Sequence, residues 1–219
     1  MPLSGQAMLI TLMDADPAEE RDFNQWYDNE HIIERVSIPG FLEARRYIAV
    51  AAEPKYLNFY TTETLDVLRS PAYLQALRNP TAWTQHHMPK FRNFTRAVAR
   101  VSASRGQGRG GALAFSRIRP SDADAAALRK TITTQLDAML DRVTSVHLLE
   151  SNPELSKAGR CLRAGYRRAR LVRCRGRDGR EIRAAAWRPA IRTKRQVAGR
   201  RNDLVRQLSA AVGSGEGLA

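Results

Sequence analysis

The order of apolar segments in this sequence predicts an α+β fold built from two ferredoxin-like βαββαβ units in tandem. Strand and helix patterns follow one another as β-α-β-β-α-β between residues 7 and 101. A glycine-rich break between Gly106 and Gly111 comes next, and a β-α-β order then begins again. We therefore expect a first unit over residues 1–104, a linker over 105–111 and a second unit over 112–219.

The first unit opens with the apolar run from Ala7 to Met13, which is typical of a buried strand. A helix follows, because Asp16 can cap it and Pro17 is tolerated in its first turn. The helix ends before Pro39, since proline restricts the residue that precedes it. Its apolar residues recur at helical spacing: Phe23, Trp26, Tyr27 and Ile33.

The second strand is predicted from Phe41 to Val50, and the third, paired with it as a hairpin, from Tyr56 to Thr62. Alternation along the second strand gives an apolar face, expected to pack under helices, and a polar face. The polar face carries Phe41, Glu43, Arg45, Tyr47 and Ala49, and the apolar face Leu42, Ala44, Arg46, Ile48 and Val50.

A second helical pattern covers Thr64 to Asn79 and is interrupted at Ser70, which can cap a new turn. A fourth strand is expected from about Thr95 to Val101. The second unit begins with a strand from Gly111 to Ile118 and a helix from Ser121 to about Arg142, and a strand from Val143 to Glu150 follows. Two such units can pack sheet to sheet and cover each other's open faces.

The formal net charge of +14 arises almost wholly from one segment. Residues 160–201 contain fifteen arginines and one lysine against two acidic residues. Three interpretations remain open for this tail. It can form a hairpin around Asp178-Gly179 followed by an amphipathic helix, or bind nucleic acid as an arginine-rich arm. It can also be the product of a frameshift near residue 160, which would leave the second unit incomplete or atypical beyond that point.

The sequence contains two cysteines, Cys161 and Cys174, which give neither a disulfide framework nor a metal-ligand spacing. No run is long and apolar enough to span a membrane, and the N-terminus lacks the order of charges and apolar residues that a signal peptide has. We therefore expect a cytoplasmic protein without a metal site or a membrane partner. We do not expect nucleic acid as a partner, because the tail lacks a binding motif.

The candidate site lies on the first helix and the strands that follow it. His31 is the candidate acid or base, because imidazole titrates near neutral pH, and Glu30 or Glu43 could orient it. Arg45 can hold a carboxylate or enolate oxygen, and Tyr47 or Tyr60 can donate a hydrogen bond to a carbonyl group. The apolar walls of the site would come from Trp26, Tyr27 and Phe59. Trp26 and Tyr27 can equally be core residues.

The runs WYDNEHIIERVSIPGFLEARRY and SPAYLQALRNPTAWTQHHMPKFRNFTR resemble an uncharacterised EthD-like branch of the dimeric α+β barrel superfamily. The resemblance covers residues 6–101 well and continues to about residue 156. It implies that two units, from one tandem chain or from a homodimer, enclose a pocket between their sheets. The superfamily includes monooxygenases, lactone isomerases, polyketide cyclases, dehydratases and haem-dependent enzymes, so the fold alone does not assign a reaction.

These residues predict a small-molecule-binding protein that carries out proton transfer, cyclisation or oxygenation on a carbonyl or aromatic compound without a cofactor. One alternative is a barrel protein with a binding or structural role and no catalytic activity. The other is a protein that binds nucleic acid through the tail. Haem is the alternative cofactor, with His86 or His87 as its ligand, although the sequence contains no haem-attachment motif. His86 and His87 are expected in a loop, and His147 is expected to be a structural residue of a strand.

Overall fold

The computed structural model describes residues 3–108, 110–158 and 182–189. Its strands are β1 (Ala7–Asp14), β2 (Phe41–Ala51), β3 (Tyr56–Thr62), β4 (Arg92–Gly106), β5 (Leu113–Ile118), β6 (Ser145–Ser151) and β7 (Ile182–Pro189). Its α-helices are α1 (Glu20–Trp26), α2 (Ile32–Val36), α3 (Pro71–Arg78), α4 (Ala82–His87), α5 (Ala125–Met139) and α6 (Pro153–Ala158).

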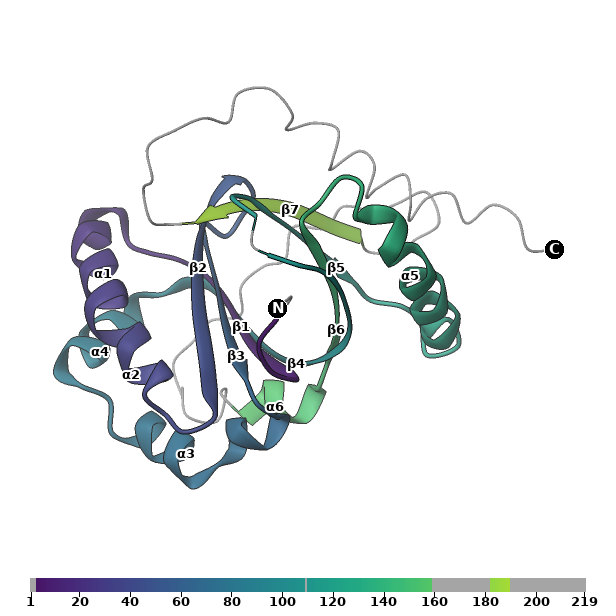
Figure 1. Ribbon diagram of the computed structural model, residues 1–219. Helices are drawn as coiled ribbons and strands as arrows, with labels where there is room; N and C mark the ends of the chain where they lie inside the picture. The colour runs from purple at the N-terminus through teal and green to yellow at the C-terminus, as the bar shows by residue number, and fades with distance from the viewer. Residues whose placement is uncertain (1–2, 109, 159–181, 190–219) are drawn as a thin grey trace.

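The seven strands form one antiparallel sheet in the order β5-β7-β2-β3-β1-β4-β6. The sheet curves strongly, with α1 to α4 outside one half of it and α5 outside the other (Figure 1). β4 is fifteen residues long and joins the two halves, since it pairs with β1 through its first part and with β6 through its last part. The chain is thus an α+β protein with a curved antiparallel sheet.

Residues 7–106 follow the element order predicted for the first unit, with two differences in the helices and one in a strand. The first helix is interrupted by a π-helical turn, Tyr27–His31, between α1 and α2. His86 and His87, expected in a loop, lie on α4, whose first turn is capped by the Thr81 hydroxyl at 3.0 Å from the Thr84 amide. β4 continues to Gly106, because pairing with β6 extends it beyond the predicted end.

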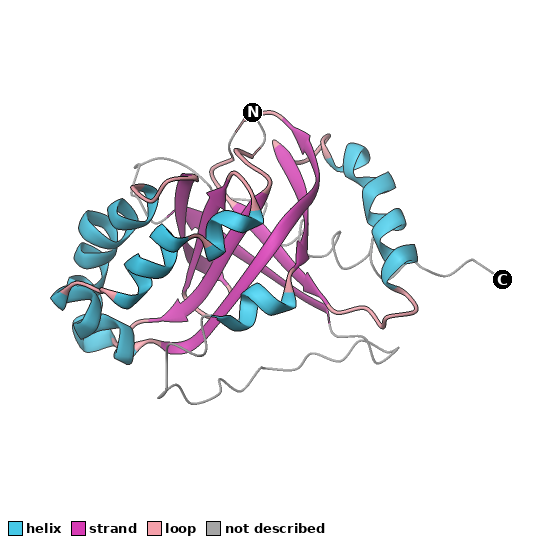
Figure 2. Ribbon diagram, turned by 90° about the horizontal axis from the view of Figure 1, so that it is seen from below, coloured by secondary structure: helices cyan, strands magenta, loops and turns pink. Residues whose placement is uncertain are grey.

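The sheet separates two apolar cores. Helices lie against the outer side of the sheet (Figure 2). The helix-side core lies on that side and contains Leu9, Met13, Phe23, Trp26, Tyr27, Ile38, Phe41, Tyr56, Tyr60, Leu68, Tyr73, Phe91 and Val98. The inner core lies on the concave face and contains Met8, Ile10, Leu12, Tyr47, Leu57, Phe59 and Ala99. Leu113, Phe115 and Leu149 of the second half pack against the inner core.

The alternation predicted for β2 holds from Glu43 to Ala49 and fails at both ends. Val50, expected under the helices, is 39% exposed. Ala44 and Ile48 pack against the helix-side core, whereas Tyr47 belongs to the inner core. Phe41 was expected on the face of Tyr47 but lies in the helix-side core, because a bulge between Phe41 and Glu43 shifts the pairing with β3. Leu42, expected under the helices, is 43% exposed.

Part of the arginine-rich tail belongs to the sheet. β7 pairs with β5 along Ile182–Trp187 and with β2 along Ala186–Pro189. The rest of the predicted tail, including the first arm of the hairpin, the amphipathic helix and the suggested frameshift point near residue 160, lies outside the described residues. Within residues 3–108, 110–158 and 182–189, no helix combines the length and the apolar character needed to cross a membrane.

Candidate functional site

The residues predicted to form one site lie on opposite faces of the sheet. His31, Trp26, Tyr27 and Tyr60 come together on the helix side, where the rings of His31 and Trp26 are 4.6 Å apart between centroids. Arg45, Tyr47 and Phe59 lie on the concave face. The single pocket expected from the sequence is therefore replaced by two polar clusters, each with its own histidine.

A π-helical turn positions the helix-side histidine. The Ile32 amide donates its hydrogen bond to the carbonyl of Tyr27, five residues earlier, instead of to the residue four earlier. Such turns insert one residue into a helix and are frequent at functional sites. The inserted residue displaces His31 relative to α1, so its ring lies beside both Trp26 and Tyr27, at 4.6 and 5.0 Å between centroids.

His31 lies at the rim of the helix-side cluster. Its side chain is 14% exposed, and its Nδ1 atom is 3.8 Å from the Glu34 carboxylate. Burial raises the pKa of Glu34, and the nearby charge of Arg35 lowers it in part. The carboxylate beside His31 is therefore that of Glu34. Glu30, which was expected to orient His31, instead accepts a hydrogen bond of 2.5 Å from the Thr81 hydroxyl.

Trp26 and Tyr27 are core residues, as the second interpretation of the sequence held. Trp26 is fully buried, and its indole Nε1 donates to the Thr84 hydroxyl at 3.1 Å. Tyr27 is 1% exposed, and its hydroxyl accepts a 2.9 Å hydrogen bond from the hydroxyl of Tyr60. Burial raises the pKa of both hydroxyls, so both groups stay neutral and can donate hydrogen bonds over the whole physiological range.

Two buried arginines lie near this pair of hydroxyls. Arg46 donates from Nη1 to Asp28 at 2.8 Å and from Nη2 to Asn24 at 2.6 Å, and its guanidinium carbon is 4.5 Å from the Tyr27 ring centroid. Arg35, from α2, is 5% exposed. The positive charges of Arg46 and Arg35 both lower the pKa of the Tyr27 hydroxyl in part, which shows that the pair lies in a positive potential.

The concave face carries the second cluster. Arg45 donates two hydrogen bonds to Glu43, from Nε at 2.8 Å and from Nη2 at 3.0 Å. The Glu43 carboxylate, and to a smaller degree Tyr47, raise the pKa of Arg45. Phe59 pairs with Arg45 across the strands and packs its ring 5.7 Å from that of Tyr47. Glu43 therefore fixes Arg45 and does not orient His31.

His147 joins this second cluster from the other half of the chain. Its Nδ1 atom is 2.7 Å from the Ser104 hydroxyl of the neighbouring strand β4. Burial lowers the pKa of His147, and the charge of Arg45 lowers it further. The lowered pKa favours the neutral imidazole at pH 7, which is the state that a general base requires.

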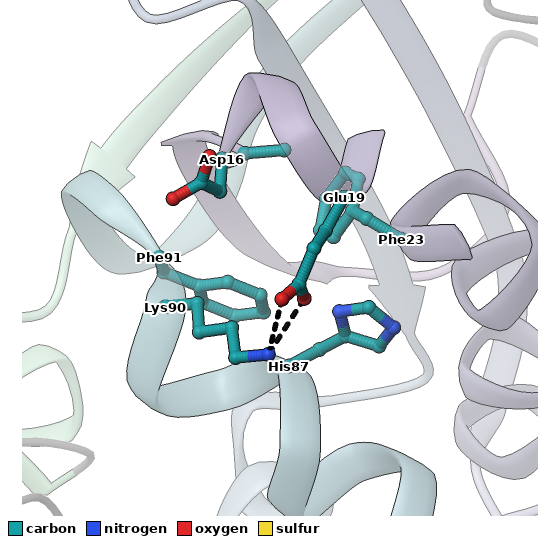
Figure 3. A pocket seen from close by; sticks show the side chains of 7 residues that line it. Asp16, Glu19, Phe23, His87, Lys90 and Phe91 are labelled. Carbon is teal, nitrogen blue, oxygen red and sulfur yellow. Dashed lines mark hydrogen bonds and ion pairs between the residues drawn. The ribbon is translucent and has the colours of Figure 1, made fainter. Parts of the chain in front are cut away.

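A third group of polar residues connects α4 to the first helix and resembles a metal site. Glu19, His86 and His87 bring their ligand atoms within 4.8 Å of one another. The Lys90 ammonium, however, is 2.6 Å from Glu19 Oε2 (Figure 3). It is also 2.8 Å from His86 Nε2. An ammonium already supplies the positive charge there, so this group forms an ion-pair network and not a metal site.

The same region does not fit haem. The Nε2 atom of His87 is 2.8 Å from the Asp22 carboxylate, and the His87 ring packs 5.1 Å from that of Trp26. The cavity beside it, lined in part by Phe23, His87 and Phe91, measures about 10 Å³, enough for one water molecule. A larger open cavity of about 430 Å³ lies at one end of the sheet, around Asp14, Val50, Lys55 and Asn93, and none of the predicted site residues lines it.

Sequence reasoning missed Arg35 and His147. Arg35 follows His31 by four residues, and His31 follows Tyr27 by four, so the helical spacing alone could have placed Arg35 on the buried face. His147 gave no such signal, because its place on the concave face follows from the pairing of β6 with β4, which are far apart in the sequence.

Comparison of the sequence with models of known families and with curated proteins finds no match. Solved structures do match. One is an anthrone oxidase-like protein, 12% identical, with a TM-score of 0.53 over 94% of this chain and 83% of that one. Another is a protein from Fusobacterium nucleatum subsp. nucleatum named as a candidate monooxygenase, 8% identical, with a TM-score of 0.47 over 85% of this chain and 94% of the other. The first similarity shows a shared α+β fold.

Proposed function

We propose that this protein is an enzyme that acts on a small carbonyl or phenolic compound at the helix-side cluster, with His31 as the acid or base. The observation that supports this most is the π-helical turn, which holds the partly exposed His31 ring against Trp26 and Tyr27. A titratable group at the rim of an aromatic core, next to buried hydrogen-bond donors, can remove a proton and stabilise the anion that forms.

The substrate would approach His31 from the surface of α2. Ile33 and Val36 of this helix are 54% and 37% exposed, which offers apolar surface to an aromatic ring beside the histidine. Proton removal by the imidazole creates an enolate or phenolate, whose charge the positive potential near Tyr27 and Tyr60 would favour. The anion can be reprotonated elsewhere, which is isomerisation, or react with oxygen.

We further propose that the reaction is an oxidation. The fold similarity to an anthrone oxidase-like protein suggests a substrate with a methylene group activated by an aromatic ketone. In that reaction molecular oxygen is the oxidant: the methylene carbon gains one oxygen as a carbonyl, and its two hydrogens leave with the other oxygen atom as water. His31 would take the first of these hydrogens as a proton.

Oxygen uptake and absorbance changes with a panel of phenolic ketones and lactones test this function. Wild type should turn over at least one compound, and His31→Ala should lose about 100-fold or more of kcat, as expected for a general acid or base. His86→Ala is the matched control, because this histidine is 49% exposed and lies in the ion-pair network. Equal activity of His31→Ala and wild type would rule the proposal out.

The inner cluster supports a second candidate site for the same class of reaction. There a neutral His147 would be the base, and Arg45 and Tyr47 would stabilise the oxyanion, as predicted from the sequence for the latter two. The observation that favours it is the burial of His147 on this face, 2.7 Å from the Ser104 hydroxyl; burial lowers the pKa of the imidazole, and the charge of Arg45 lowers it further. Loss of activity in His147→Ala together with full activity in His31→Ala would assign the reaction to this face.

The tandem organisation is part of the same proposal. In the first half the sheet order β4-β1-β3-β2 is that of a ferredoxin-like unit. β5, α5 and β6 repeat its beginning, and β7 lies beside β5 as β4 lies beside β1. The pairs β4-β6 and β2-β7 are then equivalent contacts between two units, which supports a boundary near residues 105–111. Such a tandem chain can complete one barrel without a homodimer.

A further inference from the structure

One face of the first helix changes from aromatic to cationic along its length. Phe23, Tyr27, His31 and Arg35 follow one another at intervals of four residues through α1, the π-helical turn and α2. Phe23 and Tyr27 are 2% and 1% exposed, and Arg35 at the end of the row is 5% exposed. The row therefore ends in a buried guanidinium, one helical turn after His31.

The Arg35 guanidinium has an unused donor. Its Nη1 atom is inaccessible to solvent and has no hydrogen-bond partner among the residues that the structure describes. Buried polar groups are nearly always hydrogen-bonded, and a buried charge without a partner is costly. Arg46, on the sheet below, uses both of its Nη atoms on Asp28 and Asn24, and its unpaired buried donor is Nε instead. Arg35 is thus the buried cation of this cluster whose Nη1 has no protein acceptor.

The surroundings of Arg35 suit a negatively charged ligand. The charges of Arg35 and Arg46 lower the pKa of the Tyr60 hydroxyl in part, against the larger effect of burial, so both guanidiniums act on the hydroxyl pair. The adjacent Glu34 carboxylate lies 3.8 Å from His31 Nδ1. An anionic oxygen at Nη1 would satisfy the donor and neutralise the charge, and a planar carboxylate or phenolate matches the geometry of a guanidinium.

We propose that Arg35 binds an anionic oxygen of the ligand, so that the helix-side site selects carboxylates or phenolates of aromatic compounds over their neutral analogues. This rests on the proposed function only in taking the ligand to lie beside His31. Arg35 is a specificity-determining residue in this account, and the proton transfer belongs to His31. A guanidinium placed for binding and not for stability explains why the protein keeps an unsatisfied buried donor.

Benzoate and benzamide make a matched pair of probes, since they share a shape and differ in charge. Binding to wild type, Arg35→Met and Arg69→Met is measured by the quenching of tryptophan fluorescence and by the shift in melting temperature. Met keeps much of the aliphatic volume of arginine and needs no hydrogen-bond partner. Arg69 is the control, because its side chain is 68% exposed and pairs with Asp66 on the surface.

Wild type and Arg69→Met should bind benzoate at least about tenfold more tightly than benzamide, because a charge-assisted hydrogen bond in a buried site favours the anion by about this factor or more. Arg35→Met should lose this preference and melt at the same temperature or higher, because a buried donor without a hydrogen-bond acceptor has been removed. Equal binding of the two probes to wild type, or no binding of either, would overturn the proposal.

A structural role for Arg35 gives a different result. Arg35→Met would then melt at a lower temperature and keep the wild-type ratio of the two affinities, which would also overturn the proposal. His31→Gln separates this inference from the proposed function, since it should keep the preference for benzoate while turnover falls. If His31→Gln retains turnover and Arg35→Met loses the preference, the anion site stands and the assignment of His31 as acid or base does not.

Discussion

The hydrogen bond between Tyr27 and Tyr60 gives a sharp prediction for the helix-side cluster. The two hydroxyls are 2.9 Å apart, and the side chains are 1% and 2% exposed. In Tyr27→Phe the Tyr60 hydroxyl loses its acceptor inside the core, which should cost about 2 kcal/mol of unfolding free energy. Phenylalanine keeps the ring, so the substitution leaves only a small cavity.

The reverse variant should cost less. In Tyr60→Phe the Tyr27 hydroxyl loses the donor of this bond but stays near the polar Thr11 side chain, so we expect a loss of about 1 kcal/mol. In the double variant no unpaired tyrosine hydroxyl remains. Its cost should then be about 1.5 kcal/mol and not the sum of about 3 kcal/mol, a coupling of about 1.5 kcal/mol between contacting groups.

Urea unfolding of the four proteins at pH 7, followed by tryptophan fluorescence, measures these values. The same losses should appear as decreases in melting temperature of about 2–4 °C for each kcal/mol in a chain of this size. Additivity of the two single variants, within about 0.5 kcal/mol, would refute the reasoning. It would mean that the two hydroxyls do not satisfy each other in the folded protein.

Three further predictions concern other parts of the first unit. Gly40→Ala should lower the melting temperature, because Gly40 has a φ of +87° and a Cβ atom there would lie 2.5 Å from Val67 Cγ2. Adding Val67→Ala to this variant should restore only part of the melting temperature, since the backbone strain at position 40 remains. Ser70→Ala should cost about 1 kcal/mol in urea unfolding, because the Ser70 hydroxyl caps α3 by accepting a hydrogen bond from the Tyr73 amide; an unchanged midpoint would contradict this. Burial raises the pKa of Tyr56 to about 12, so its proton is retained in the folded protein above pH 10 but lost in the unfolded chain. Stability should therefore fall between pH 10 and pH 12, and Tyr56→Phe should show a smaller fall in melting temperatures across that range.

Local patterns predicted the elements of the first unit well. Alternation, capping residues and the Pro39-Gly40 turn each have a local physical cause, and the structure retains Asp16 and Ser70 as the caps of their helices. The interruption at Tyr27–His31 could not be predicted in the same way. A π-helical turn depends on how the helix packs on the sheet. The residues of this turn would suit a regular α-helix equally well, so the local sequence does not indicate it.

The arrangement of the predicted site residues could not be read from the sequence, and their roles stay a prediction. The sequence brings His31 and Arg45 within fifteen positions of each other, which favoured one pocket. His31 of the helix, however, lies on one face of the sheet, and Arg45 of the strand points to the other face. Side chains on opposite faces of a sheet cannot line the same pocket. Arg35 escaped attention because a charged residue on a helix is usually solvated, and its burial follows from packing alone.

The most direct test of the account asks which face of the sheet carries out the chemistry. Turnover of the best substrate found for wild type should be measured for His31→Ala and His147→Ala side by side, with melting temperatures recorded to confirm that both variants fold. The account predicts a loss of about 100-fold or more in kcat for His31→Ala and a rate close to that of wild type for His147→Ala. The opposite pattern, with activity lost only in His147→Ala, would contradict it.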